Sequence, residues 1–195
     1  MPPREDAYRL MISHVKNESL QKHMLSVEVA MRFYARKYGE AEELWAIAGL
    51  LHDCDYEEYP DLHEHTQVAA GWLLEAGYDE RIVHAILAHN HLNLEANPRS
   101  DLMSRALYAC DEITGMITAT ALVRPNKTLP GLEVSSVRKK MKAKSFAAGV
   151  NREDLLEGAA ELGVDLDEHI AFVIEAMSSI ADVLGLAGTA ELAAN

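Results

Sequence analysis

Apolar side chains recur every three or four residues along most of the chain, the spacing that places them on one face of an α-helix. In the first such segment, Leu20, Met24 and Val27 share a face that continues to Tyr34. The same spacing predicts helices over residues 20–38, 40–53, 65–76, 80–87, 101–123, 151–162 and 165–184. Strand-type alternation persists nowhere, so the pattern predicts an all-α protein, a single-domain helical bundle.

Residues that stop or cap helices stand at the ends of several of these segments. Gly39 follows the first helix, where a left-handed residue is favoured, and Asn151 and Asp165 precede the last two, where a capping side chain is favoured. We expect an N-terminal extension over residues 1–16, the bundle over 17–186 and a frayed tail over 187–195.

Composition and charge narrow the class of protein. Of the 195 residues, 49% are hydrophobic and 25% charged, which excludes disordered and low-complexity classes. The formal net charge is −13, so we expect no nucleic-acid duplex as partner. The sequence shows neither the apolar core of a signal peptide nor an apolar run of roughly 20 residues that could span a membrane, so we expect no membrane partner. With two cysteines, Cys54 and Cys110, and no disulfide framework, we expect a cytoplasmic protein with both thiols buried.

One segment, 124–152, departs from this acidic background. It holds eight Lys and Arg residues against one acid, Glu133, and so carries a net charge of +7. Arg138, Lys139 and Lys142 are candidates to bind an anionic substrate, because phosphate esters need positive charge around the transferring group. For most basic side chains of this segment, the alternative is a solvated helix face.

Histidines and acids occur on faces that the pattern predicts to be buried. They are His23, His52, Asp53, His65, His89 and Asp111. A carboxylate in such a place is costly to bury without a partner, and binding a cation would offset that cost. Imidazole nitrogen and carboxylate oxygen are ligands suited to Zn, Mn, Fe, Ni or Co. The pattern therefore indicates a candidate metal site.

Each of these residues also has an ordinary structural explanation. His23 could be a core histidine with satisfied hydrogen bonds, Asp53 a helix-end residue, and His65 a first-turn residue with its edge in solvent.

Two further alternatives concern Asp111 and His89. Asp111 could pair with Arg105 instead of binding a metal. His91 competes with His89, although positions two apart point to nearly opposite sides of a continuing helix.

The order of these residues resembles the HD superfamily of metal-dependent phosphohydrolases. Its hallmark is a separate histidine, a His-Asp pair closing an apolar helix, and a distant aspartate, which match His23, His52-Asp53 and Asp111. The stretch from His52 to Tyr59, His-Asp-Cys-Asp-Tyr-Glu-Glu-Tyr, further resembles small stand-alone bacterial HD proteins that are regarded as predicted hydrolases.

The resemblance implies an HD-type bundle and a ligand set. One metal would be held by His23, His52, Asp53 and Asp111. Members with a second metal place histidines where this chain has His65 and His89, with the counterpart of Asp53 bridging. The cofactors implied are one or two divalent transition metals, Mn, Fe, Co, Ni or Zn, with Mg an alternative.

The activity implied is that of a metal-dependent phosphohydrolase, a phosphomonoesterase or phosphodiesterase. It would act on a nucleotide or another small phosphorylated metabolite through metal-activated water, with Asp53 in the catalytic site. One of Asp55, Glu57 and Glu58 could serve as general acid, or all three could form a solvated acidic loop. The alternatives are a di-iron HD-fold oxygenase and a non-catalytic metal-binding module.

A homodimer is a further hypothesis. The last predicted helix carries an apolar stripe that includes Ile170, Val173, Ile174, Met177 and Ile180. Such a stripe either contacts a second copy or belongs to the core of the same chain.

Overall fold

A computed structural model describes residues 1–188, so the predicted tail lies outside the described residues from position 189 onward. The described elements are α1 (Arg4–His14), α2 (Glu18–Tyr38), α3 (Glu42–Leu51), α4 (Gln67–Glu75), α5 (Glu80–His89), η1 (His91–Asn93), α6 (Leu102–Leu122), α7 (Val134–Met141), α8 (Arg152–Leu162), α9 (Leu166–Ser178) and α10 (Ala181–Leu184). Within residues 1–188 strand-type pairing is limited to an isolated bridge between Thr128 and Ala187. The predicted all-α fold is confirmed.

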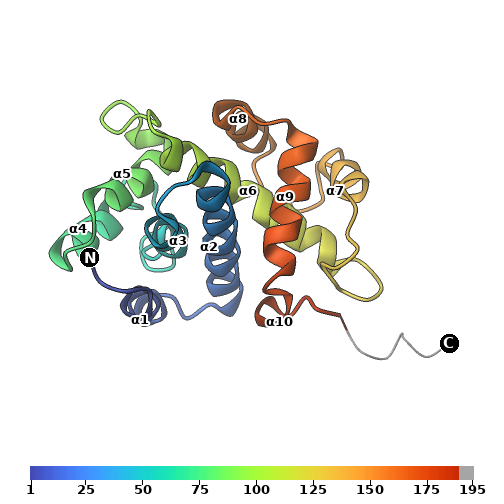
Figure 1. Cartoon of the computed structure of the whole chain (residues 1–195), viewed down its shortest axis with the longest axis horizontal. Helices are drawn as coiled ribbons and strands as arrows, with labels where there is room; N and C mark the ends of the chain where they lie inside the picture. Colours follow the sequence, from blue (N-terminus) through green and yellow to red (C-terminus); the bar gives the residue numbers. More distant parts are fainter. Residues whose placement is uncertain (189–195) are drawn as a thin grey trace. The chain divides into compact units, whose positions relative to one another are not determined.

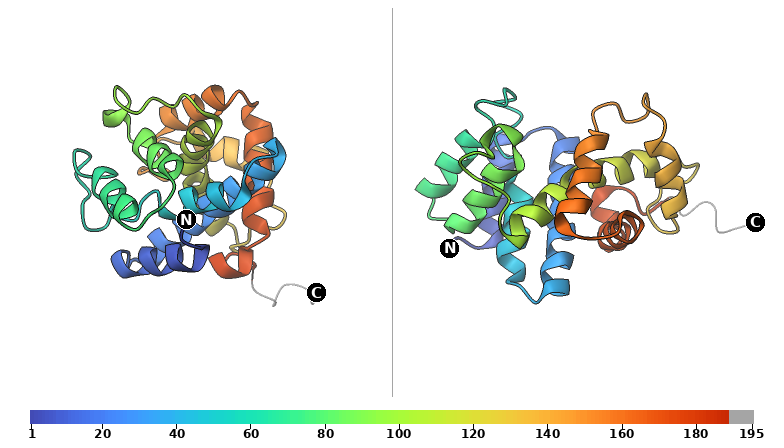
Figure 2. Two further views of the ribbon diagram at one scale, coloured as in Figure 1. Left: turned by 60° about the vertical axis from the view of Figure 1, so that its left-hand side comes forward. Right: turned by 90° about the horizontal axis from the view of Figure 1, so that it is seen from above.

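The chain divides into two compact units, Met1–Tyr108 and Ala109–Asn195, which are described separately. In the first unit, α3 contacts α1, α2 and α5, and α4 packs on α5 (Figure 1). Figure 2 shows the blue α2 and the cyan α3 running side by side, joined by a short loop. The centre of this unit is α3, and every residue from Leu44 to Leu51 is buried, as its all-round apolar sequence predicts.

The ends of α2 follow from its sequence. The Asn17 side chain accepts hydrogen bonds from the amides of Ser19 and Leu20, which have no partner within the helix. At the other end Gly39 adopts a left-handed conformation, with φ of 70°. This geometry fixes the length of α2 and sets its turn into α3.

Within the first 16 residues, α1 (Arg4–His14) is a helix that the apolar pattern did not predict. Ala7, Met11 and Val15, spaced four apart, are buried in the first unit, and α1 contacts α3. Arg4 binds the nearly buried carboxylate of Glu28 on α2 through two hydrogen bonds of 2.6 and 2.8 Å. The segment predicted to be an N-terminal extension therefore packs within the first unit.

Two predicted helix boundaries are wrong. The helix predicted from position 65 begins at Gln67, because Thr66 has a φ of 69° and Asp55 accepts hydrogen bonds from the amides of Thr66 and Ala69. The last predicted helix divides after Ser178 into α9 and α10, with Ile180 outside α-helical geometry.

In the second unit, α9 contacts both α7 and α8. Four residues of its apolar stripe, Ile170, Val173, Ile174 and Met177, are buried within the chain, which favours the intramolecular explanation of that stripe over a dimer contact. Two arginines of the basic segment bind backbone: Arg124 donates to Thr128 and Gly131, and Arg152 to Ala147 and Val150. Among residues 1–188, a helix both long and apolar enough to cross a membrane is not found.

Candidate metal centre

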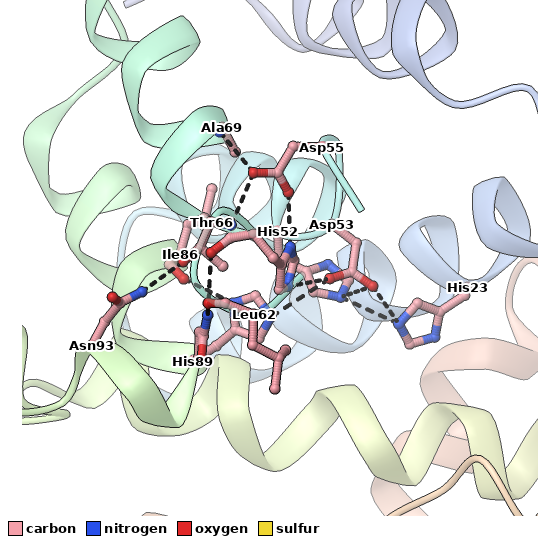
Figure 3. A network of polar contacts seen from close by, with 12 residues as sticks. His23, His52, Asp53, Asp55, Leu62, Thr66, Ala69, Ile86, His89 and Asn93 are labelled. Atoms are coloured by element: carbon pink, nitrogen blue, oxygen red, sulfur yellow. Dashed lines mark hydrogen bonds and ion pairs between the residues drawn. The ribbon is translucent and has the colours of Figure 1, made fainter. Parts of the chain in front are cut away.

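Five of the predicted ligands come together within the first unit (Figure 3). His23 lies in α2, His52 and Asp53 follow the last residue of α3, His65 precedes α4, and His89 is the last residue of α5. The packing of α3 against α2 and α5 therefore brings together His23, His52, Asp53 and His89. His52, His65 and His89 are buried, whereas His23 and Asp53 are partly exposed.

The Asp53 carboxylate lies between two pairs of imidazoles. Its Oδ2 atom is 3.8 Å from Nε2 of His23 and 3.5 Å from Nε2 of His52. Its Oδ1 atom is 3.4 Å from Nε2 of His65 and 3.5 Å from Nε2 of His89. Each oxygen thus faces its own pair of ring nitrogens, as a carboxylate shared by two cations would.

Three of the imidazoles are held in one tautomer. The Nδ1 atoms of His52 and His89 are each 2.8 Å from a backbone carbonyl, of Gly49 and Ile86 respectively. The Nδ1 atom of His65 is 2.8 Å from a carboxylate oxygen of Asp55. Carbonyl and carboxylate oxygens only accept hydrogen bonds, so Nδ1 carries the proton in each ring. In the neutral rings, Nε2 then has the lone pair that a metal ion requires.

The His23 and His52 rings approach each other through these nitrogens. Their Nε2 atoms are 3.2 Å apart. Two lone pairs repel at this distance, so the pair requires a proton or a cation between them. Metal–nitrogen bonds of about 2.1 Å place neighbouring ligand atoms about 3.0–3.4 Å apart, which the His23–His52 separation matches. In the second group, the ligand atoms of Asp53, His65 and His89 also lie close together, within 4.8 Å of one another.

The acidic loop after the His-Asp pair has defined partners. Asp55 is fully buried and accepts hydrogen bonds from His65, Thr66 and Ala69. Glu57 accepts hydrogen bonds from the amides of Lys16 and Asn17, at 2.9 and 2.8 Å.

Glu58 lies 3.0 Å from Nδ1 of His14, whose ring stacks on Trp72. All three candidate general acids thus have structural contacts. The role of Asp55 beside His65 was missed because position 65 was assigned to a helix and no spacing rule links it to position 55.

Other histidines of the first unit lie away from the Asp53 carboxylate or on the surface. His91, the competitor of His89, is exposed at the start of η1. His84 pairs with Asp101 at 3.3 Å and lines a hollow of about 510 Å³ together with Trp45 and Arg81. The structure thus brings His89, and not His91, to Asp53.

The remaining predicted residues belong to the second unit. Asp111 lies in α6, two residues after Ala109, whose carbonyl accepts a 2.8 Å hydrogen bond from buried His169. Its role as a metal ligand stays a prediction.

The three basic candidates also stay predictions as substrate-binding residues. Arg138 pairs with Asp167 at 3.1 Å, and Lys139 is exposed on α7. Lys142 lines a hollow of about 590 Å³ with Lys144 and Arg152, so positive charge does gather there.

Neither cysteine has the character of a nucleophile. Both Cys54 and Cys110 are buried, as expected. Burial raises the pKa of the Cys54 thiol well above its usual value, and the neighbouring Asp55 and Asp53 charges add to the effect. Burial likewise raises the pKa of Cys110, with Asp111 contributing. Both thiols therefore stay protonated at neutral pH.

Comparison with known protein families gives a match. Residues 20–116 match the family model described as HD domain. This span includes His23, the His52-Asp53 pair and Asp111. Neither the search of curated proteins nor the search of solved structures found a match.

Proposed function

Because the chain belongs to the HD superfamily, we propose that it is a metal-dependent phosphohydrolase. HD-domain proteins are commonly metal-dependent hydrolases, which supports the reaction class. The substrate we propose is a nucleotide or another small phosphorylated metabolite, cleaved as a phosphomonoester or a phosphodiester.

The observation that carries the proposal is the position of Asp53 between two imidazole pairs. In the proposed site, His23, His52 and Asp53 hold a first metal, with Asp111 as the fourth ligand that the family pattern predicts. Asp53, His65 and His89 hold a second metal. The donor set of imidazole and carboxylate suits Mn, Fe, Co, Ni or Zn, and Mg as an alternative.

The chemistry that divalent metals supply in such a site is Lewis-acid activation of water at neutral pH and neutralisation of charge on a phosphoryl group. The protein's own residues hold the ligand atoms in place. The backbone carbonyls of Gly49 and Ile86 orient the rings of His52 and His89. Such contacts to the outer ring nitrogen fix the ligand's tautomer and direction before the metal binds.

Substrate attraction is the role we propose for the basic segment. Lys139 and Lys142 are exposed, and Arg138 forms an ion pair with Asp167. The chain as a whole has a net charge of −13, whereas segment 124–152 has a net charge of +7, which would attract a phosphorylated molecule locally. We propose Arg138, Lys139 and Lys142 as substrate-binding residues on this ground.

The experiment is a hydrolysis assay on metal-stripped protein. Phosphomonoesters and phosphodiesters are supplied with Mn, Co, Ni, Mg, Zn or Fe, and phosphate or nucleoside release is measured. We expect metal-dependent release that His52→Ala abolishes, while His91→Ala, a matched change at an exposed histidine, keeps it.

Release that survives in His52→Ala protein, folded by circular dichroism, would contradict the proposal. So would consumption of oxygen by the iron-loaded protein with no hydrolysis of any phosphoester, because that result identifies an oxygenase.

A further inference from the structure

Asp55 is a buried carboxylate of the first unit to which the proposed reaction gives no task. Its side chain is wholly inaccessible to solvent. A carboxylate in that environment needs several hydrogen-bond donors to offset its loss of water. The donors present are therefore the first indication of what the residue does.

Three donors surround the two oxygens of Asp55. Oδ1 is 2.8 Å from Nδ1 of His65. Oδ2 accepts from the amides of Thr66 and Ala69, both at 2.8 Å. The two amides hold Oδ2, so Oδ1 is directed at the imidazole. Figure 3 shows dashed lines from the Asp55 carboxylate to Ala69 and Thr66.

The three buried histidines of the first unit, His52, His65 and His89, obtain their Nδ1 acceptors in different ways. His52 and His89 each donate to a carbonyl three residues earlier in the chain, Gly49 and Ile86. Both lie at the C-terminal end of a helix, which places that carbonyl next to the ring. The equivalent carbonyl for His65 belongs to Leu62.

His65 does not use that arrangement, because its Nδ1 atom contacts Asp55 instead. It precedes α4 instead of ending a helix. The Leu62 carbonyl accepts a 2.8 Å hydrogen bond from the Asn90 side chain. Thr66, the next residue, has a φ of 69°, a conformation that is costly for a β-branched residue and turns the chain away from helical geometry. Asp55 supplies the acceptor that the local backbone does not.

We propose that Asp55 is a positioning residue that holds His65 as the Nδ1–H tautomer, with Nε2 turned to Asp53. This inference rests on the proposed function, in which His65, His89 and Asp53 hold a second metal. Removing the carboxylate is expected to lower the affinity for that metal about 10- to 100-fold, the usual effect of losing the hydrogen-bond partner of a ligand histidine. The His23–His52 pair, oriented by other contacts, keeps its metal.

The test is the Asp55→Asn protein, with Glu57→Gln as a matched control from the same loop. An amide has one oxygen, and the two backbone amides of Thr66 and Ala69 require it. The amide NH₂ group then faces His65, whose Nδ1 must accept, and the proton moves to Nε2. We expect this tautomer change in the ¹⁵N spectrum of metal-free protein, whereas wild type and Glu57→Gln show the Nδ1–H form.

Metal titration gives the second measurement. We expect two bound metals per chain for wild type and Glu57→Gln, and one for Asp55→Asn at the same free Mn concentration. A wild-type protein whose His65 is protonated at Nε2 overturns the inference even if Asp55→Asn does not fold. An Asp55→Asn protein with an unchanged tautomer, or with both metals bound as tightly as wild type, also overturns it.

The two proposals fail in distinguishable ways. A protein that binds metals but hydrolyses no phosphoester refutes the proposed function and leaves the tautomer result intact. A His65 tautomer that does not depend on Asp55 refutes the positioning role, whatever the hydrolysis assay shows.

Discussion

Gly49 orients His52 and, at the same residue, lets α3 approach the backbone of α2. Its carbonyl accepts the hydrogen bond from Nδ1 of His52 at 2.8 Å. A Cβ atom placed on Gly49 would lie 2.9 Å from backbone atoms of both Val27 and Glu28. Because α2 also carries His23, the packing of these two helices sets the distance between the paired imidazoles.

The Gly49→Ala substitution is therefore expected to separate α2 from α3. The added methyl meets backbone, which cannot rotate away, so the free energy of unfolding should fall by about 1–3 kcal/mol. Urea unfolding measures that loss, and metal titration should show weaker binding. Gly71→Ala is the control, since its Cβ meets nothing within 4 Å, and it should raise stability by up to about 1 kcal/mol. Equal effects of the two changes would contradict this account.

His89 and His91 provide a second matched pair. His89 is buried with Nε2 3.5 Å from Asp53, and His91 is exposed two residues later. We expect His89→Ala to lower the bound metal from two ions per chain to one, and His91→Ala to leave two. Metal analysis after gel filtration measures both. Loss of an ion in the His91→Ala protein would show that the ligand assignment is wrong.

The ion-pair network of Glu42 predicts an acid-dependent part of the stability. Hydrogen bonds from Arg36, and then from Arg32, lower the pKa of the Glu42 carboxyl from 4.5 to about 2. A carboxyl with a lowered pKa stabilises the folded state above its unfolded pKa, and that contribution disappears as the pH falls from 4.5 toward 2. We expect Glu42→Gln to reduce stability at pH 7 by up to about 1 kcal/mol, a value limited by solvent screening.

Urea unfolding of wild type and Glu42→Gln at several pH values tests this. The difference between the two proteins should be present at pH 7, shrink as the pH falls below 4.5 and vanish only below pH 2. A difference that stays constant over this range would mean that Glu42 acts through packing and not through its charge.

The two cysteines should be unreactive in the folded protein. Both are buried and have raised thiol pKa values, so neither forms a thiolate near neutral pH. We expect no labelling by iodoacetamide at pH 7.5 under native conditions and two labels after unfolding in urea. Mass spectrometry counts the labels, and rapid native labelling of Cys54 would show that the loop after α3 opens.

Sequence periodicity located the helices best where apolar residues and end signals agreed. For α2, both the face that carries His23 and the stop at Gly39 were predicted. The pattern missed α1, whose few apolar residues give a weak periodic signal. At His65 it predicted a helix start, because the spacing to Val68 is helical. The hydrogen bonds of Asp55 override that local preference, and a long-range contact of this kind leaves no periodic signal.

The candidate site was predicted by a different kind of signal. The order of His23, His52-Asp53 and Asp111 identified the family, and the match over residues 20–116 supports it. The competition between His89 and His91 was decided by where α5 ends, a boundary that spacing alone places poorly. The partners of Glu57 and Glu58 depend on α1 and the residues after it, so they could not be predicted without that helix.

The shared carboxylate of Asp53 makes the two halves of the centre thermodynamically linked. An ion bound by His23 and His52 would fix the rotamer of Asp53 and so preorganise the oxygen that faces His65 and His89. By reciprocity, an ion in the second half would favour occupancy of the first to the same degree. Loss of the ion from one half should then weaken the binding of the ion in the other half without abolishing it.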